Sequence, residues 1–118
     1  MKFNYIYGKQ AEQYDYLYIP KAFMKEELFK SMTASAKIMY AVLMEKQQKS
    51  VEMGWIDEKD HAYILANIVA IGTELNWDEA EVLAAVEELE RFGLVEIAEK
   101  SEDIKLYLKR FCLCVIKK

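Results

Sequence analysis

Two helices and a β-hairpin follow one another between Asn67 and Arg110, and this order constrains the fold more than any other feature. The apolar residues of both helices recur at helical spacing, Ile68, Ile71 and Leu75 in the first and Val82, Val86 and Leu89 in the second. From residue 94 onward the spacing changes to alternation, which is typical of strands. Two alternating runs, 94–98 and 104–108, flank the polar turn 99–103. The pattern predicts helix, turn, helix and hairpin, in that order.

Capping residues mark where these elements begin and end. Asn67 is suited to cap the first helix, and Asp78 with Glu81 forms a D-x-x-E variant of the capping box at the start of the second. Gly93 is the expected residue just past its end. The fold class predicted is α+β, mainly α: a winged helix-turn-helix in which residues 67–92 form the helix-turn-helix and residues 94–110 the β-hairpin wing.

A central helix is expected over residues 33–50, capped by Thr33. Between residues 36 and 44 only Lys37 is charged, so this helix should be buried nearly all round. A short helix over residues 22–30 is expected before it, with apolar contacts from Phe23, Leu28 and Phe29. The segment Ala62 to Ala66 reads as a short strand.

The first 20 residues form an extended aromatic arm. Aromatic side chains alternate along it at Phe3, Tyr5, Tyr7, Tyr14, Tyr16 and Tyr18, and Ile6, Leu17 and Ile19 occupy the opposite phase. An arm that is apolar on both faces suits packing between the core and a second subunit, which predicts a homodimer. Stacking on nucleic-acid bases is the other interpretation, but such sites normally interleave Arg, and the arm has none.

At the other end of the chain the apolar phase shifts by one residue at Lys109 and Arg110. The shift predicts a bulge or a break before a strand-like tail, residues 111–118, which could pair across subunits. Cys112 and Cys114 lie two apart in this tail, on one face of a strand, where they are poorly placed to bond each other. We interpret them as buried structural thiols.

Size and composition exclude several classes of protein. The 118 residues, 53% of them hydrophobic, fit a single domain over 1–118. No apolar run reaches the roughly 18 to 20 residues that span a bilayer, and the first residues lack a secretory signal, so a cytoplasmic protein is expected. One histidine, His61, with one cysteine pair falls short of a metal site. Without a nucleophile motif or phosphate-binding loop, no enzyme, cofactor or small-molecule substrate is expected.

Acidic and basic residues are segregated along the chain. Residues 51–99 carry thirteen acidic residues against Lys59 and Arg91, a net charge of −11. The flanks are basic, with +3 over residues 1–50 and +4 over residues 100–118. The overall charge of −4 therefore hides two surfaces of opposite sign, which suit different partners.

Several short motifs, in order, resemble those of a known family. They are Tyr18-Ile19-Pro20-Lys21, Ser35-Ala36-Lys37 with Tyr40 and Leu43, Gly54-Trp55-Ile56-Asp57 with Tyr63, and finally Leu89-Glu90 and Gly93-Leu94. The stretch from 16 to 97 resembles the N-terminal domain of plasmid replication initiators of the RepA N-terminal type, and its layout is similar to that of phage replisome organisers. The resemblance implies a winged helix that binds repeated DNA sites at an origin, with the recognition helix over 76–92.

The chain departs from this family at the recognition helix. DNA-binding members usually open it with Ser or Thr followed by Arg or Lys, whereas this chain has Asn76-Trp77-Asp78-Glu79. Six acidic residues face a single cation, Arg91, between residues 76 and 92. Those in the first turn suit the helix macrodipole, but Glu87, Glu88 and Glu90 do not, so they indicate a solvated face or a partner surface. The initiators also continue into a C-terminal domain.

Two functions are compatible with this sequence. The leading hypothesis is a DNA-binding module that contacts duplex DNA mainly through its wing and basic flanks. Its candidate contacts are Asn76, Lys100, Lys105, Lys109, Arg110, Lys21 and Lys37.

The alternative is a protein-docking adaptor whose acidic second helix binds a basic protein partner, with DNA bound weakly or not at all. Its candidate contacts are Trp77, Glu87, Glu88 and Glu90. Trp77 is suited equally to closing the core of the helix-turn-helix, and Trp55 is expected to pack. A mimic of the charge of DNA is a more distant form of the same hypothesis.

Overall fold

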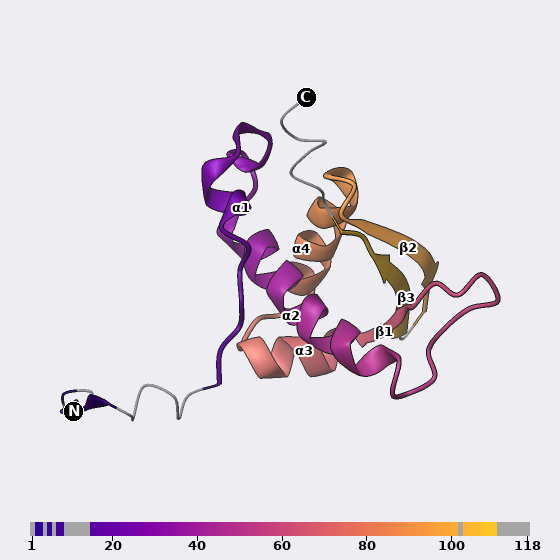
Figure 1. Cartoon of the computed structure of the whole chain (residues 1–118), viewed down its shortest axis with the longest axis horizontal. Helices are drawn as coiled ribbons and strands as arrows, with labels where there is room; N and C mark the ends of the chain where they lie inside the picture. The colour runs from indigo at the N-terminus through magenta and orange to yellow at the C-terminus, as the bar shows by residue number, and fades with distance from the viewer. Residues whose placement is uncertain (1, 4, 6, 9–14, 102, 111–118) are drawn as a thin grey trace.

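The computed structural model describes residues 2–3, 5, 7–8, 15–101 and 103–110. It confirms the winged helix-turn-helix, an α+β fold that is mainly helical (Figure 1). The elements follow in the order α1 (Ala22–Lys25), the 3-10 helix η2 (Glu27–Phe29), α2 (Ala34–Ser50), β1 (Ile64–Asn67), α3 (Ile68–Leu75), α4 (Glu79–Arg91), β2 (Val95–Lys100) and β3 (Asp103–Leu108). The predicted tail over 111–118, with both cysteines, lies outside the described residues.

The three strands form one antiparallel sheet in the order β1-β3-β2, with β2 and β3 as the wing. Ile104 and Leu106 of β3 are buried and point toward the helices, so this side is called the inner face and the opposite side the outer face. The register shifts between Ile97 and Glu99, which marks a bulge at Ala98. The sequence did not predict this bulge; it predicted a bulge or a break at Lys109 and Arg110, and β3 ends at Leu108, just before these residues.

Helix α2 is the centre of the fold, as its apolar sequence predicts. Seven of its residues are buried, Ala36, Met39, Tyr40, Ala41, Val42, Leu43 and Ser50. Thr33 caps it, because its hydroxyl oxygen accepts a hydrogen bond from the Ala36 amide at 3.2 Å. The Tyr40 hydroxyl donates to the Lys109 carbonyl at 3.1 Å, and burial raises the pKa of this phenol above 10.0 despite Arg110 nearby. The central helix thus holds the end of the wing.

The turn between α3 and α4 is closed by backbone contacts. Asn76 ends α3 in the left-handed conformation, with φ at 60°, and the Trp77 amide donates to the Gly72 carbonyl at 2.8 Å. A Cβ atom at Gly72 would lie 2.6 Å from the Trp77 carbonyl oxygen, so only glycine fits there. Asp78 caps α4 by accepting from the Glu81 amide at 2.8 Å, as predicted. The angle between the two helices is therefore fixed by this turn.

The predicted boundaries at Asn67 and Gly93 are also confirmed. Asn67 accepts from the Ala70 amide at 2.9 Å at the start of α3. Gly93 follows α4 with φ at 81°, the left-handed conformation that glycine adopts readily.

The prediction of one short helix over 22–30 was wrong. Glu26 is extended, with φ −84° and ψ 135°, and divides the segment into α1 and η2. The division buries Phe23 and Phe29, whose rings meet edge to face with centroids 4.8 Å apart. Leu28, expected to be an apolar contact, is instead 57% exposed, because the 3-10 turn directs it away from the core.

The described residues of the aromatic arm do not pack into the core of their own chain. Residues 2–3, 5 and 7–8 lie away from the body of the domain (Figure 1), and Phe3 and Tyr5 are almost fully exposed. Toward the end of the arm, Ile19 is partly buried against the core, and Tyr16 and Leu17 line a small cavity with Ala41 and Met44 of α2. Tyr14 and Ile6 lie outside the described residues.

Candidate nucleic-acid interface

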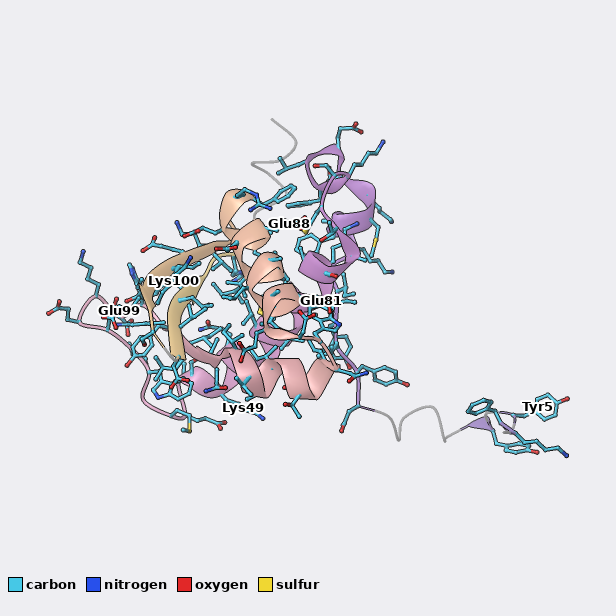
Figure 2. The ribbon with its side chains drawn as sticks, turned by 180° about the vertical axis from the view of Figure 1, so that it is seen from behind. Tyr5, Lys49, Glu81, Glu88, Glu99 and Lys100 are labelled. Carbon is cyan, nitrogen blue, oxygen red and sulfur yellow. The ribbon has the colours of Figure 1, made fainter. Side chains whose placement is uncertain are left out.

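Helix α4 stands between the wing and α1. Its buried residues are Val82, Ala85, Val86 and Leu89. The positions on the opposite side of the helix, at i, i+4, i+7 and i+11, form an outward stripe of Ala80, Ala84, Glu87 and Arg91. In Figure 2 the wing with Lys100 lies to one side of α4 and α1 to the other. The stripe combines two small residues with one acid and one cation. The helical spacing of the buried residues is enough to identify these outward positions from the sequence.

The wing reaches α4 through an ion pair between Lys100 and Glu87. The Lys100 ammonium nitrogen lies 3.2 Å from Oε2 of Glu87, and the two side chains are 54% and 46% exposed. Such an exposed pair contributes only about 0.2–1 kcal/mol to stability. The pair matters because of where it lies: Glu87, the acid of the outward stripe, already has a partner within the domain.

Glu88 is also engaged within the domain, on the other side of α4. Its carboxylate accepts from the Thr33 amide through Oε2 and from the Thr33 hydroxyl through Oε1, both at 2.7 Å. The carboxylate thus lies at the positive end of the α2 macrodipole. Sequence reasoning missed this contact because the two residues are 55 positions apart. Glu90, the third acid of the predicted partner surface, is exposed.

Two of the predicted wing cations, Lys105 and Lys109, lie on the outer face of the sheet. The Lys105 ammonium sits 4.6 Å from the centre of the Tyr63 ring, and the Lys109 ammonium lies 3.4 Å from Oε1 of Glu96. Lys105 alternates with buried Ile104 and Leu106 along β3, so it points away from α4, and Lys109, just past the strand, pairs with Glu96 on the same face as Tyr107. Arg110 is exposed just past the strand. The structure therefore does not bring these three cations together with Lys100.

A hydrogen-bonded cluster joins the outer face to the loop before β1. Asp57 accepts from the Tyr107 hydroxyl at 2.8 Å and from the amides of Lys59 and His61 at 2.9 Å each. The hydrogen bond from the His61 amide, aided by the other two, holds the pKa of Asp57 below 3.8 although desolvation opposes it. Its bond to Asp57 raises the pKa of Tyr107 above 10.0. The cluster fastens a loop and has no exposed basic group aimed at α4.

The basic flank meets the far end of α4. The rings of Phe29 and Phe92 lie with centroids 6.3 Å apart, so the adjacent cations Lys30 and Arg91 are at the same end of the molecule. Lys30 pairs with Glu27 at 2.9 Å. Of the two predicted flank contacts, Lys21 is exposed, whereas Lys37 is partly buried with its ammonium 3.7 Å from the Met24 sulfur. Cations therefore lie on both sides of α4.

The two residues of the helix-turn-helix turn differ in exposure. Asn76 is exposed beside the start of α4, where the recognition-helix position of the family would place it. Trp77 is partly buried against the core, which confirms the packing interpretation and leaves little of the ring for a partner. Trp55 is partly buried as well, beside the start of the 57–62 loop.

Neither a metal site nor a membrane span is found in the part of the chain that the structure describes. No group of three or more His, Cys, Asp or Glu side chains that could hold a metal ion occurs among these residues. None of the helices formed by these residues is long and apolar enough to cross a bilayer.

Comparison with known proteins relates this geometry to a family. Residues 15–116 match the family described as the replication initiator protein A (RepA) N-terminus. No curated protein matched the chain. A solved structure titled "Structure of Rep-DNA complex" is similar with a TM-score of 0.73 and 25% identity, covering 91% of this chain and 84% of that chain.

Two further solved structures share the fold. "N-Terminal domain of DNA binding protein" has a TM-score of 0.74 and 24% identity, covering 92% of this chain and 85% of that chain. "Structure of MDR initiator" has a TM-score of 0.74 and 23% identity, covering 91% of this chain and 86% of that chain. Because the family match extends over most of the chain, the resemblance seen in the sequence is confirmed, and this chain belongs to the family of replication initiator protein A N-termini.

Proposed function

We propose that this domain binds duplex DNA as the N-terminal part of a replication initiator of a plasmid or related mobile element. Membership of the RepA N-terminus family supports the initiator role, and the similarity to a solved Rep–DNA complex supports contact with DNA. The domain is proposed to be a binding module in the cytoplasm and to carry out no catalysis of its own.

In the proposed complex α4 enters the major groove with its outward stripe toward the bases. Ala80 and Ala84 allow close approach of the helix backbone, and Asn76 lies beside the first turn, where it can reach base edges or phosphate. The acidity of α4 opposes this arrangement less than its sequence indicates, because Glu88 is held by Thr33 at the start of α2 and is directed away from the wing.

One observation carries the proposal: cations lie on both sides of α4. Lys100 on the wing and Lys30 near α1 lie on the two sides of α4, and Arg91 lies at the end of its outward stripe, so in the proposed complex these cations meet the phosphate backbones that border the major groove. Lys21 and Lys37 extend the second group, although Lys37 is partly buried. Lys105 and Lys109, which the sequence predicted as contacts, lie on the outer face and are not part of the proposed interface, so they serve as its control.

The proposed unit on DNA is a homodimer. The exposed aromatic residues of the arm support this, since Phe3, Tyr5 and Tyr18 are 86%, 85% and 78% exposed. Exposed aromatic side chains in a row are unusual on a monomer and typical of an interface. Light scattering at micromolar concentration is expected to give twice the mass of the chain, and a monomer would contradict this part.

Fluorescence anisotropy with a labelled pool of mixed duplexes, titrated upward in salt, tests DNA binding. We expect log K to fall linearly with log salt, with a slope of about −0.9 for each phosphate contacted. The double variant Arg91→Ala, Lys100→Ala should lose between about one and two units of that slope, because Lys100 is shared with Glu87 in the natural chain. The matched control Lys105→Ala, Lys109→Ala removes equal charge from the outer face and should change the slope little.

Absence of binding by the natural chain, even at low salt, would overturn the proposal. The adaptor for a basic protein partner would then be the remaining prediction, resting mainly on exposed Glu90 and the acids of the first turn of α4. Equal loss in both double variants would instead contradict the proposed orientation and leave DNA binding in place.

A further inference from the structure

The bulge at Ala98 determines which side of the wing carries Lys100. Ile97 pairs with Leu106, but after the bulge Glu99 pairs with Lys105 and Lys100 pairs with Ile104. Ile104 is buried on the inner face, and paired residues in a sheet project to the same face. If Ala98 were an ordinary strand residue, Lys100 would pair with Asp103 and project to the outer face. The extra residue therefore directs the Lys100 ammonium toward α4.

Glu87 is the acid that receives this ammonium, and it lies in the outward stripe. Its carboxylate is therefore at the surface that meets DNA in the proposed function, 3.2 Å from the wing cation. The Lys100 ammonium cannot form a full ion pair with Glu87 and with a DNA phosphate at the same time. Because both side chains are about half exposed, the pair is weak enough for a phosphate to displace.

We propose that Glu87 is a built-in competitor of DNA phosphate that holds Lys100 on α4 and keeps the affinity of the domain for duplex DNA below what its cations allow. The inference rests on the proposed function. Glu87 acts in two ways, by restraining Lys100 and by adding a negative charge near the phosphates. A replication initiator has to release its sites as well as bind them, and a weakened wing contact favours release.

The other acids of this part of α4 do not share the role. Glu88 is held by the amide and hydroxyl of Thr33 on the opposite side, away from the wing. Glu90 is exposed and makes no ion pair with any residue that the structure describes, so it provides a matched control on the same helix. Among the residues that the structure describes, Glu87 alone joins an outward position of α4 to a cation of the wing.

Anisotropy titrations of Glu87→Gln, Glu90→Gln, Lys100→Ala and the double variant Glu87→Gln, Lys100→Ala test the proposal. We expect Glu87→Gln to bind mixed duplexes about fivefold more tightly than the natural chain at low salt. This factor corresponds to the ~1 kcal/mol Coulomb energy of two unit charges about 4 Å apart in water. Its salt slope should steepen by up to about 0.9, the equivalent of one phosphate contact, because Lys100 is no longer shared with Glu87. Glu90→Gln should leave the slope unchanged.

The double variant separates the two actions of Glu87. If Glu87 acts by restraining Lys100, the steeper slope must disappear when Lys100 is also removed. A Glu87→Gln variant that binds like the natural chain or like Glu90→Gln would overturn the inference while leaving the proposed function standing, and so would a slope gain that persists without Lys100. If no variant binds DNA, both fall. Thermal unfolding of each variant confirms that folding is retained, and Glu87→Ala serves as a second neutral substitution.

Discussion

The inner and outer faces of the wing sheet place cations of one short hairpin in different surroundings. On the inner side, Lys100 reaches across to α4 and pairs with Glu87. On the outer face, Lys105 covers the Tyr63 ring and Lys109 pairs with Glu96, next to the Tyr107–Asp57 bond. The difference teaches that a basic hairpin is not automatically a basic surface. Side chains alternate between the two faces along each strand, and the bulge at Ala98 shifts this alternation once. The alternation therefore determines which cation of the wing lies close enough to α4 to pair with it.

The largest expected difference between the faces is in stability. Leu106 is fully buried on the inner face, so Leu106→Ala should lower the free energy of unfolding by about 2–5 kcal/mol. Tyr107 follows it on the outer face, and Tyr107→Phe removes only the hydrogen bond to Asp57, with an expected loss of about 0.5–1.5 kcal/mol. Urea denaturation measures both. Equal losses would mean that the outer cluster supports the fold as strongly as the core does.

A smaller effect on stability is expected from the contact between α2 and the side of α4 that faces away from the wing. Thr33→Ala removes the cap of α2 and one of two hydrogen bonds to Glu88, and should cost about 1 kcal/mol of unfolding free energy. Thr73→Ala is the control, because the Thr73 hydroxyl donates only to the Val69 carbonyl one turn earlier in its own helix. A loss for Thr33→Ala no greater than for Thr73→Ala would show that the contact between α4 and α2 is unimportant for stability.

The smallest expected effect is the acid sensitivity of the outer cluster. Its hydrogen bonds lower the pKa of Asp57 in the folded state below 3.8, so the unfolded state binds more protons at acid pH. The hydrogen bonds to Asp57 therefore stabilise the fold above the carboxyl pKa of the unfolded chain. This stabilisation is lost as the pH falls through the lowered pKa of the folded state. Between pH 6 and 2, Asp57→Asn should therefore lose less of its thermal midpoint than the natural chain.

Glu58→Gln is the control for this pH series, because it lies in the same loop and accepts none of the three hydrogen bonds to Asp57. It should follow the natural chain through the acid range. An unchanged profile for Asp57→Asn would mean that the cluster does not respond to protonation of this carboxyl group.

Sequence reasoning succeeded where the signal is local. The caps at Thr33, Asn67 and Asp78 bond to amides three residues ahead, so spacing alone identifies them. The buried stripe of α4 and the central position of α2 follow from apolar periodicity in the same way. The order of the elements, and with it the fold class, could therefore be predicted.

What failed depends on contacts between distant parts of the chain. The bond between Thr33 and Glu88 joins residues 55 positions apart, and nothing in either neighbourhood indicates it. The bulge at Ala98 follows from the pairing of two strands, so the alternation of one strand does not reveal it. Leu28 was expected to be buried by helical spacing, but the break at Glu26 replaces that spacing with a 3-10 turn. For the same reason, the sequence predicted a single basic surface from cations that are neighbours along the chain but lie on different faces of the wing sheet.

Gly72 and the outward stripe of α4 differ in how much sequence variation they tolerate. At Gly72 any side chain would collide with the Trp77 carbonyl, so the angle between α3 and α4 depends on a position that tolerates no variation. On α4, by contrast, Ala80 and Ala84 face solvent, so larger side chains fit there without disturbing the core. Under the proposed function, substitutions in the stripe alone can therefore change the DNA preference of such domains, while Gly72 keeps the angle between α3 and α4 unaltered.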